Sequence, residues 1–80
     1  MPTVLSEGGF EVVIYTTDRM PPHVHVWRGG CEVAIHLGDA DTRPKVDGPH
    51  RLKRQELRAA LELVARHQAY LLRVWEMYHG

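Results

Sequence analysis

A glycine pair between two alternating segments constrains the fold of this chain more than any other feature. Gly29-Gly30 separates residues 23–27 from residues 31–37, and apolar and polar residues alternate in both segments. This pattern predicts a tight β-hairpin, because the turns that close such hairpins need positive φ angles, which glycine adopts easily. The first half of the chain is therefore expected to form an antiparallel sheet.

The position of the turn also fixes the register of this hairpin. With Gly29-Gly30 as the loop, Val26 faces Val33, Val24 faces Ile35 and His23 faces His36. Since successive side chains point to opposite faces of a strand, the two faces differ in character. One carries Val24, Val26, Val33 and Ile35, and the other carries His23, His25, Trp27, Glu32 and His36. The apolar face is predicted to be the core, because a slip of one residue would mix the two sets.

The remaining segments complete an outline of the fold. Gly8-Gly9 separates Val4-Leu5 from the β-branched and aromatic residues 10–16, which predicts a second hairpin. Residues 38–50 are rich in glycine, proline and charge, and they are expected to form a loop. The sheet is thus expected to cover residues 3–37 with three to four strands.

The spacing of apolar residues becomes helical from about residue 53 to residue 78. One stripe at intervals of four and three contains Leu57, Leu61, Val64, Gln68, Leu71, Trp75 and Tyr78; a second contains Ala60, Leu63, His67, Tyr70, Val74 and Met77. A straight helix of this length would be about 39 Å long, whereas strands of five to seven residues span roughly 17–24 Å. We therefore expect a break or bend near residues 66–68, or docking of the helix end on another chain.

These elements predict an α+β fold, a small antiparallel sheet followed by a long C-terminal helix or helix pair packed on one face. Eighty residues are expected to form a single domain, 1–80. No apolar segment approaches the roughly 20 residues that span a bilayer, and the lone Cys31 offers no internal disulfide. A cytoplasmic protein without a membrane partner is expected.

Charge is unevenly distributed although the net charge is zero. Residues 1–42 carry two cationic and six acidic side chains, and residues 43–66 carry seven cationic and three acidic ones. Four cations gather where the helix is expected to begin: Arg51, Lys53, Arg54 and Arg58. Cations oppose the helix dipole at that end, so this basic group is a candidate contact for nucleic acid or another anion. The alternative is a solvated surface.

Three histidines carry the candidate chemistry of the sheet. His23 and His25 project from the same face of one strand, and His36 faces His23 across the hairpin. Three imidazoles that converge can bind a metal such as zinc, and Asp18 or Glu32 could add an oxygen ligand. Alternatively, His23 and His25 act as a general acid and base, because histidine titrates near neutrality. The third interpretation is a sheet surface without chemistry.

Several segments resemble one bacterial family over nearly the whole chain. They are Met1-Pro2-Thr3-Val4-Leu5, Gly9-Phe10, Pro21-Pro22-His23-Val24-His25-Val26, and Leu71-Leu72 followed by Trp75, Tyr78 and Gly80. In these the chain resembles the domain of unknown function 4160 (DUF4160). The resemblance implies no established activity; such proteins resemble members of two-gene modules and are suspected toxin–antitoxin partners. The family pattern differs at His36, where an aromatic or aliphatic residue is usual, and near Lys53, where a small capping residue is usual.

The leading hypothesis from this resemblance is a small bacterial interaction protein of toxin–antitoxin type. It would be the toxin-like member, bound to a small partner protein, and any catalysis would be directed at RNA through His23 and His25. The first alternative is a metal-binding domain that uses His23, His25 and His36. The second is a homo-oligomeric or regulatory module without catalysis. No cofactor is expected apart from a divalent metal such as zinc.

Overall fold

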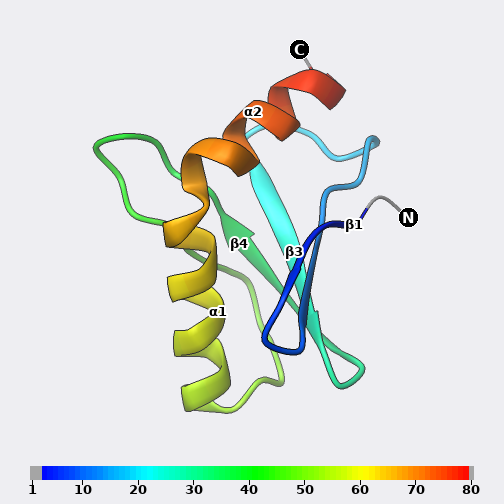
Figure 1. Cartoon of the computed structure of the whole chain (residues 1–80), viewed down its shortest axis with the longest axis vertical. Coiled ribbons are helices and arrows are strands. Elements are labelled where there is room, and N and C mark those ends of the chain that lie inside the picture. Colours follow the sequence, from blue (N-terminus) through cyan, green and yellow to red (C-terminus); the bar gives the residue numbers. More distant parts are fainter. Residues whose placement is uncertain (1–2, 80) are drawn as a thin grey trace.

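The computed structural model describes residues 3–79 and contains one antiparallel sheet and two helices (Figure 1). The elements are β1 (Thr3–Glu7), β2 (Phe10–Val13), β3 (His23–Arg28), β4 (Cys31–His36), β5 (Lys45–Asp47), α1 (Arg54–Arg66) and α2 (Gln68–His79). The strands lie in the sheet in chain order, and every neighbouring pair is antiparallel. The expected α+β class is confirmed.

The β3–β4 hairpin has the register that the glycine pair predicts. All six pairs from Arg28–Cys31 to His23–His36 are present, and Gly29 and Gly30 have φ angles of 57° and 82°. The four valine and isoleucine side chains of the apolar face are at most 1% exposed. The alternation of side chains therefore placed the core on the correct face.

The sheet is one strand larger than expected. The three-residue strand β5 lies inside the segment 38–50, which we expected to be a loop, and it pairs Val46 with Ile35. With Lys45 and Asp47 on either side of a single apolar residue, the segment is too short and too polar for an alternating pattern to appear. A short, charged edge strand of this kind also discourages pairing with other chains.

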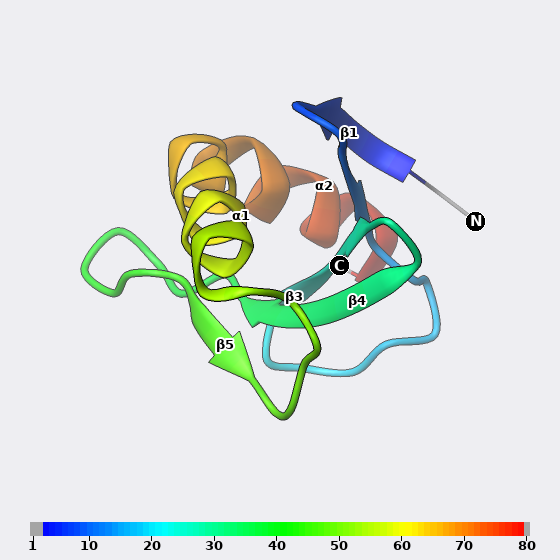
Figure 2. The same cartoon turned by 90° about the horizontal axis from the view of Figure 1, so that it is seen from below.

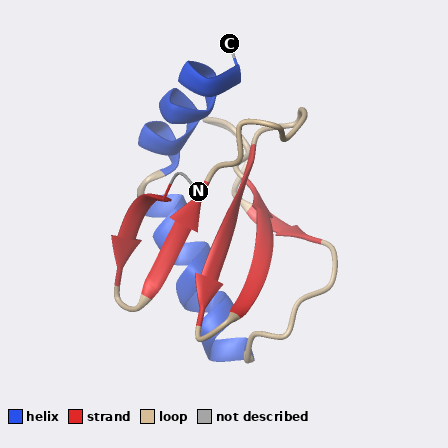
Figure 3. Ribbon diagram, turned by 90° about the vertical axis from the view of Figure 1, so that its right-hand side faces the viewer, coloured by secondary structure: helices blue, strands red, loops and turns tan. Residues whose placement is uncertain are grey.

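Both helices lie on the same side of the sheet (Figure 2). Buried residues of α1 (Ala60, Leu63 and Val64) and of α2 (Leu71, Val74 and Trp75) join the apolar face of the sheet in one hydrophobic cluster. Within residues 3–79, no helix lies on the opposite face of the sheet (Figure 3). The histidines of β3 and β4 belong to that second face, because they alternate with the buried valines.

The helical segment breaks at His67, as the length argument predicts. α1 ends at Arg66, α2 begins at Gln68, and α2 continues past the ends of the strands (Figure 3). The side-chain amide nitrogen of Gln68, Nε2, donates to the carbonyl oxygens of Leu37, Asp39 and Thr42 at 2.7, 2.9 and 3.0 Å. The first turn of α2 is therefore anchored to the loop that follows β4.

Two ion pairs connect α1 to the C-terminal ends of β1 and β3. Arg66 lies 2.6 Å from a carboxylate oxygen of Glu7, and Arg28 lies 3.3 Å from one of Glu56. The Arg66 hydrogen bond lowers the pKa of Glu7, and the backbone N–H of Lys53, followed by Arg28, lowers that of Glu56.

Among the described residues, no helix is long and apolar enough to cross a membrane.

Candidate functional site

The histidine cluster, which consists of His23 and His25, lies where β3 begins, on the sheet face opposite the core, and Trp75 of α2 borders it at the end of the sheet. His23 and His25 project from this face two residues apart, with 5.3 Å between their ring centroids. The two side chains are 16% and 18% exposed. They are thus sheltered from bulk water but remain accessible to a small ligand.

Asp18 reaches the two imidazoles from the loop before β3. A turn orders this loop, in which the backbone N–H of Asp18 donates to the carbonyl oxygen of Tyr15 at 3.1 Å. The Asp18 Oδ2 atom then lies 3.2 Å from His23 Nε2 and 3.1 Å from His25 Nε2. One carboxylate oxygen is therefore shared by two imidazole nitrogens.

The remaining ring nitrogens of these histidines also face oxygen atoms. His23 Nδ1 lies 2.9 Å from the carbonyl oxygen of Pro21 and must donate to it, because a carbonyl can only accept. His25 Nδ1 lies 3.2 Å from Glu32 Oε2, without the alignment of a hydrogen bond. Each imidazole is thus held between two oxygen-bearing groups.

His36 takes a different partner from the one expected of a metal ligand. Its ring centroid is 6.3 Å from that of His23, but its Nε2 atom lies 3.4 Å from Asp47 Oδ2. The ligand atoms of Asp18, His23 and His25, by contrast, all lie within 4.8 Å of one another. The structure thus brings together two of the three predicted histidines and one of the two suggested carboxylates, with Glu32 behind His25.

Aromatic side chains surround the cluster. The ring of Tyr15 meets His25 edge-on at 4.7 Å, and the indole of Trp75 lies 5.3 Å from the His23 ring. Trp75 in turn stacks on His79 at 3.7 Å, and it is itself only 2% exposed. The C-terminal helix therefore contacts the histidine cluster as well as the core.

The basic group lies at the other end of the sheet. Arg51, Lys53, Arg54 and Arg58 are all exposed. Arg28, the last residue of β3, pairs with Glu56 in the first turn of α1, whereas His23 is the first residue of that strand. Six residues of strand separate the two ends by roughly 17 Å. A small ligand cannot contact the basic group and the histidine cluster together.

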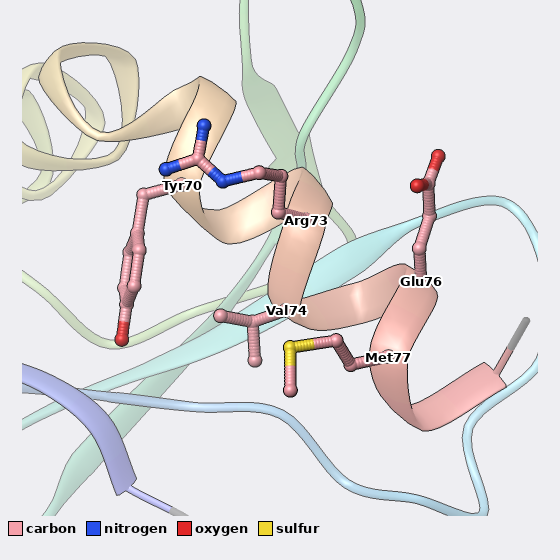
Figure 4. Close-up of a pocket in the computed structure, with 5 residues that line it drawn as sticks. All are labelled: Tyr70, Arg73, Val74, Glu76 and Met77. Atoms are coloured by element: carbon pink, nitrogen blue, oxygen red, sulfur yellow. The ribbon is translucent and has the colours of Figure 1, made fainter.

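A third feature is an exposed apolar surface on α2. Tyr70, Val74 and Met77 follow one another at intervals of four and three, and with Arg73 and Glu76 they line a shallow depression (Figure 4). Tyr70 is 39% exposed and Met77 is 80% exposed, whereas Val74 between them is 9% exposed and belongs to the core. We call Tyr70, Val74 and Met77 the α2 stripe. The sequence shows these residues as half of a longer stripe, whose α1 members Ala60 and Leu63 are buried.

Two contributors to this region were not predicted from the sequence. The carbonyl of Pro21 orients His23, and the amide of Gln68 anchors α2. A backbone carbonyl has no signature in a sequence, and Gln68 occupies a position of the apolar stripe. A polar residue at an otherwise apolar position of a helix was the available signal.

Comparison with known proteins identifies a family. The model of the family described as "Domain of unknown function (DUF4160)" matches residues 9–76. The match includes β2 to β5, both histidines of β3 and most of α2. Neither the curated proteins nor the solved structures gave a significant match.

Proposed function

The chain belongs to the DUF4160 family, and from its exposed apolar helix surface we propose that it is the interaction component of a toxin–antitoxin-type two-gene module. In this proposal it acts in the bacterial cytoplasm and binds a small partner protein through the α2 stripe. The observation that carries the proposal is the exposure of Met77 and Tyr70 on a helix whose opposite side is already buried in the core.

The chemistry of the α2 stripe suits a protein partner. Methionine is flexible and polarizable, so an exposed Met77 can adapt to an apolar partner surface. Tyr70 combines an apolar ring with a hydroxyl, which donates to the carbonyl oxygen of Val4 at 2.9 Å and holds the ring in place. Arg73 and Glu76 border the depression with opposite charges. We therefore expect a partner that inserts apolar side chains and presents polar groups of both signs around them.

Co-expression with the product of the adjacent gene tests this proposal. Met77→Glu should weaken capture of the partner at least tenfold, because it places a charge in the apolar contact. Met20→Glu is the matched control: Met20 is also highly exposed, at 71%, but lies outside the α2 stripe. Equal capture by both variants would refute the proposal. A wild-type dimer that Met77→Glu converts to a monomer, without partner binding, would instead support the homo-oligomeric module.

An RNA-directed toxin is the second candidate function. It is favoured by the position of His23 and His25, two partly exposed imidazoles beside one carboxylate, which is an arrangement suited to proton transfer. The exposed basic group would then contact RNA at a distance from the cleavage point. Induction of the chain alone should arrest growth, and a soluble His23→Ala, His25→Ala variant should not. Unchanged growth with both would remove this candidate.

A further inference from the structure

The imidazoles of the histidine cluster face more oxygen acceptors than their protons can serve. The carbonyl of Pro21 takes the proton on His23 Nδ1, so the Nε2 atom of a neutral His23 has a lone pair. That lone pair lies 3.2 Å from Asp18 Oδ2, which also has only lone pairs to offer. Two acceptors at this distance repel each other unless a second proton on the imidazole or a metal ion lies between them.

His25 meets the same difficulty on its own two sides. Its Nε2 atom is hydrogen-bonded to Asp18 Oδ2 at 3.1 Å, whereas its buried Nδ1 atom lies 3.2 Å from Glu32 Oε2 without a hydrogen-bond partner. A neutral imidazole has one N–H group, so it can donate to only one of these carboxylates. Across the cluster, four nitrogen atoms face oxygen acceptors, whereas two neutral imidazoles supply two protons.

We propose that Asp18, His23 and His25 form a binding site for one divalent transition-metal ion, with Zn²⁺ as the expected ion. The two Nε2 lone pairs and Asp18 Oδ2 then bind the ion. Both Nδ1 atoms are then free to carry protons: His23 Nδ1 donates to the Pro21 carbonyl, and His25 Nδ1 lies 3.2 Å from Glu32 Oε2, which would accept its proton after a small rotation of the Glu32 side chain. Metal-binding histidines usually donate their second ring N–H to a carbonyl or a carboxylate in this way.

Distances and charges agree with this site. Zn–N and Zn–O bonds of about 2.0–2.1 Å place the ligand atoms of a tetrahedral site about 3.3–3.4 Å apart. The two distances from Asp18 Oδ2, 3.1 and 3.2 Å, lie within a few tenths of an ångström of that value. A dication also balances the two carboxylates, Asp18 and Glu32. Two imidazole ligands favour zinc over magnesium or calcium, which prefer oxygen.

Three protein ligands leave one position of a tetrahedral site open. Zinc sites of that composition normally hold a water molecule or a substrate at the fourth position. The partial exposure of all three side chains, between 16% and 22%, permits this access. The site is independent of the α2 stripe, and with both Nε2 atoms on the metal the imidazoles would no longer act as the free acid and base of the second candidate function.

Zinc titration of tag-free, chelator-treated protein tests the proposal. Wild-type protein should bind one equivalent of Zn²⁺, and Asp18→Asn and His23→Ala should each bind it more than a hundredfold more weakly. Glu32→Gln, which alters only the support of His25, should cost about 10–100-fold. His36→Ala is the matched control, because His36 lies on the same face but pairs with Asp47; it should bind like wild type.

The outcomes separate this site from its competitors. Absence of stoichiometric zinc in wild-type protein would overturn the proposal. Loss of binding in His36→Ala with retention in Asp18→Asn would overturn it in favour of three histidines. Imidazole nitrogen spectra of the wild-type protein require no variant to fold: Zn²⁺ should shift Nε2 of His23 and His25 but not that of His36. Growth after induction tests the RNA-directed toxin and not zinc binding, so either growth result leaves the zinc titration decisive for this site.

Discussion

Replacement of Gln68 by methionine should destabilise the protein by about 1–2 kcal/mol. The Gln68 amide has two hydrogens and serves three carbonyl oxygens, on Leu37, Asp39 and Thr42. A net hydrogen bond contributes about 0.5–1.5 kcal/mol, and two of the three are exposed. Methionine has a similar length and helix propensity, so the loss reflects the missing donors.

Gln68→Glu should be worse, with a loss of about 2–3 kcal/mol. A glutamate carboxylate cannot donate, and it would place its charge against the same three carbonyl oxygens. Urea unfolding followed by circular dichroism measures both effects as a shift in midpoint at constant slope.

Gln55→Met is the matched control for this series. Gln55 is exposed in the first turn of α1, and none of the side-chain hydrogen bonds seen in residues 3–79 involves it. This variant should stay within about 0.5 kcal/mol of wild type. If Gln68→Met matches the control, or if Gln68→Glu is as stable as Gln68→Met, the anchoring role of Gln68 is refuted.

Three further predictions concern stability. Lys53→Ser should raise the free energy of unfolding by about 0.5–1 kcal/mol, because serine can accept a backbone N–H at the helix N-cap and lysine cannot; unchanged urea unfolding would contradict this. Gly38→Ala should cost about 2–4 kcal/mol, since φ is +69° and a Cβ atom would overlap the Thr42 carbonyl oxygen; thermal unfolding measures the loss, and a near-neutral result would exclude the overlap. Arg66 lowers the pKa of Glu7 from its ordinary value of 4.5, so the ionised carboxylate stabilises the fold above that pH, and this contribution disappears as pH falls through the lowered pKa. Glu7→Gln should therefore be less stable than wild type at pH 7, with the gap in urea midpoint closing as the pH falls through the lowered pKa of Glu7; a gap independent of pH would refute the assignment.

The sequence predicted the parts of the fold that depend on local periodicity. Alternation around Gly29-Gly30 gave the register of β3 and β4, because side-chain direction in a strand has a strict period of two. The length of the helical segment likewise predicted its break near His67. The strand β5 was missed because its pairing depends on an edge that only the folded sheet provides.

The candidate site was only partly predictable for a similar reason. Spacing identified His23 and His25, but the choice between Asp18, Glu32 and His36 depends on where a loop and side-chain rotamers direct them. The loop carries Asp18 over the start of β3, whereas β5 brings Asp47 to His36. Neither event leaves a periodic trace in the sequence.

The position of Trp75 gives the protein an optical reporter of its own. Its indole packs in the core and lies 5.3 Å from the His23 ring, whereas Trp27, the other of the two tryptophans, lies near the far end of β3. In a Trp27→Phe background, the fluorescence of Trp75 alone would report any ligand that reorients His23. Because the same indole packs α2 against the core, such a ligand would also change the stability of this packing, and α2 carries the proposed partner surface.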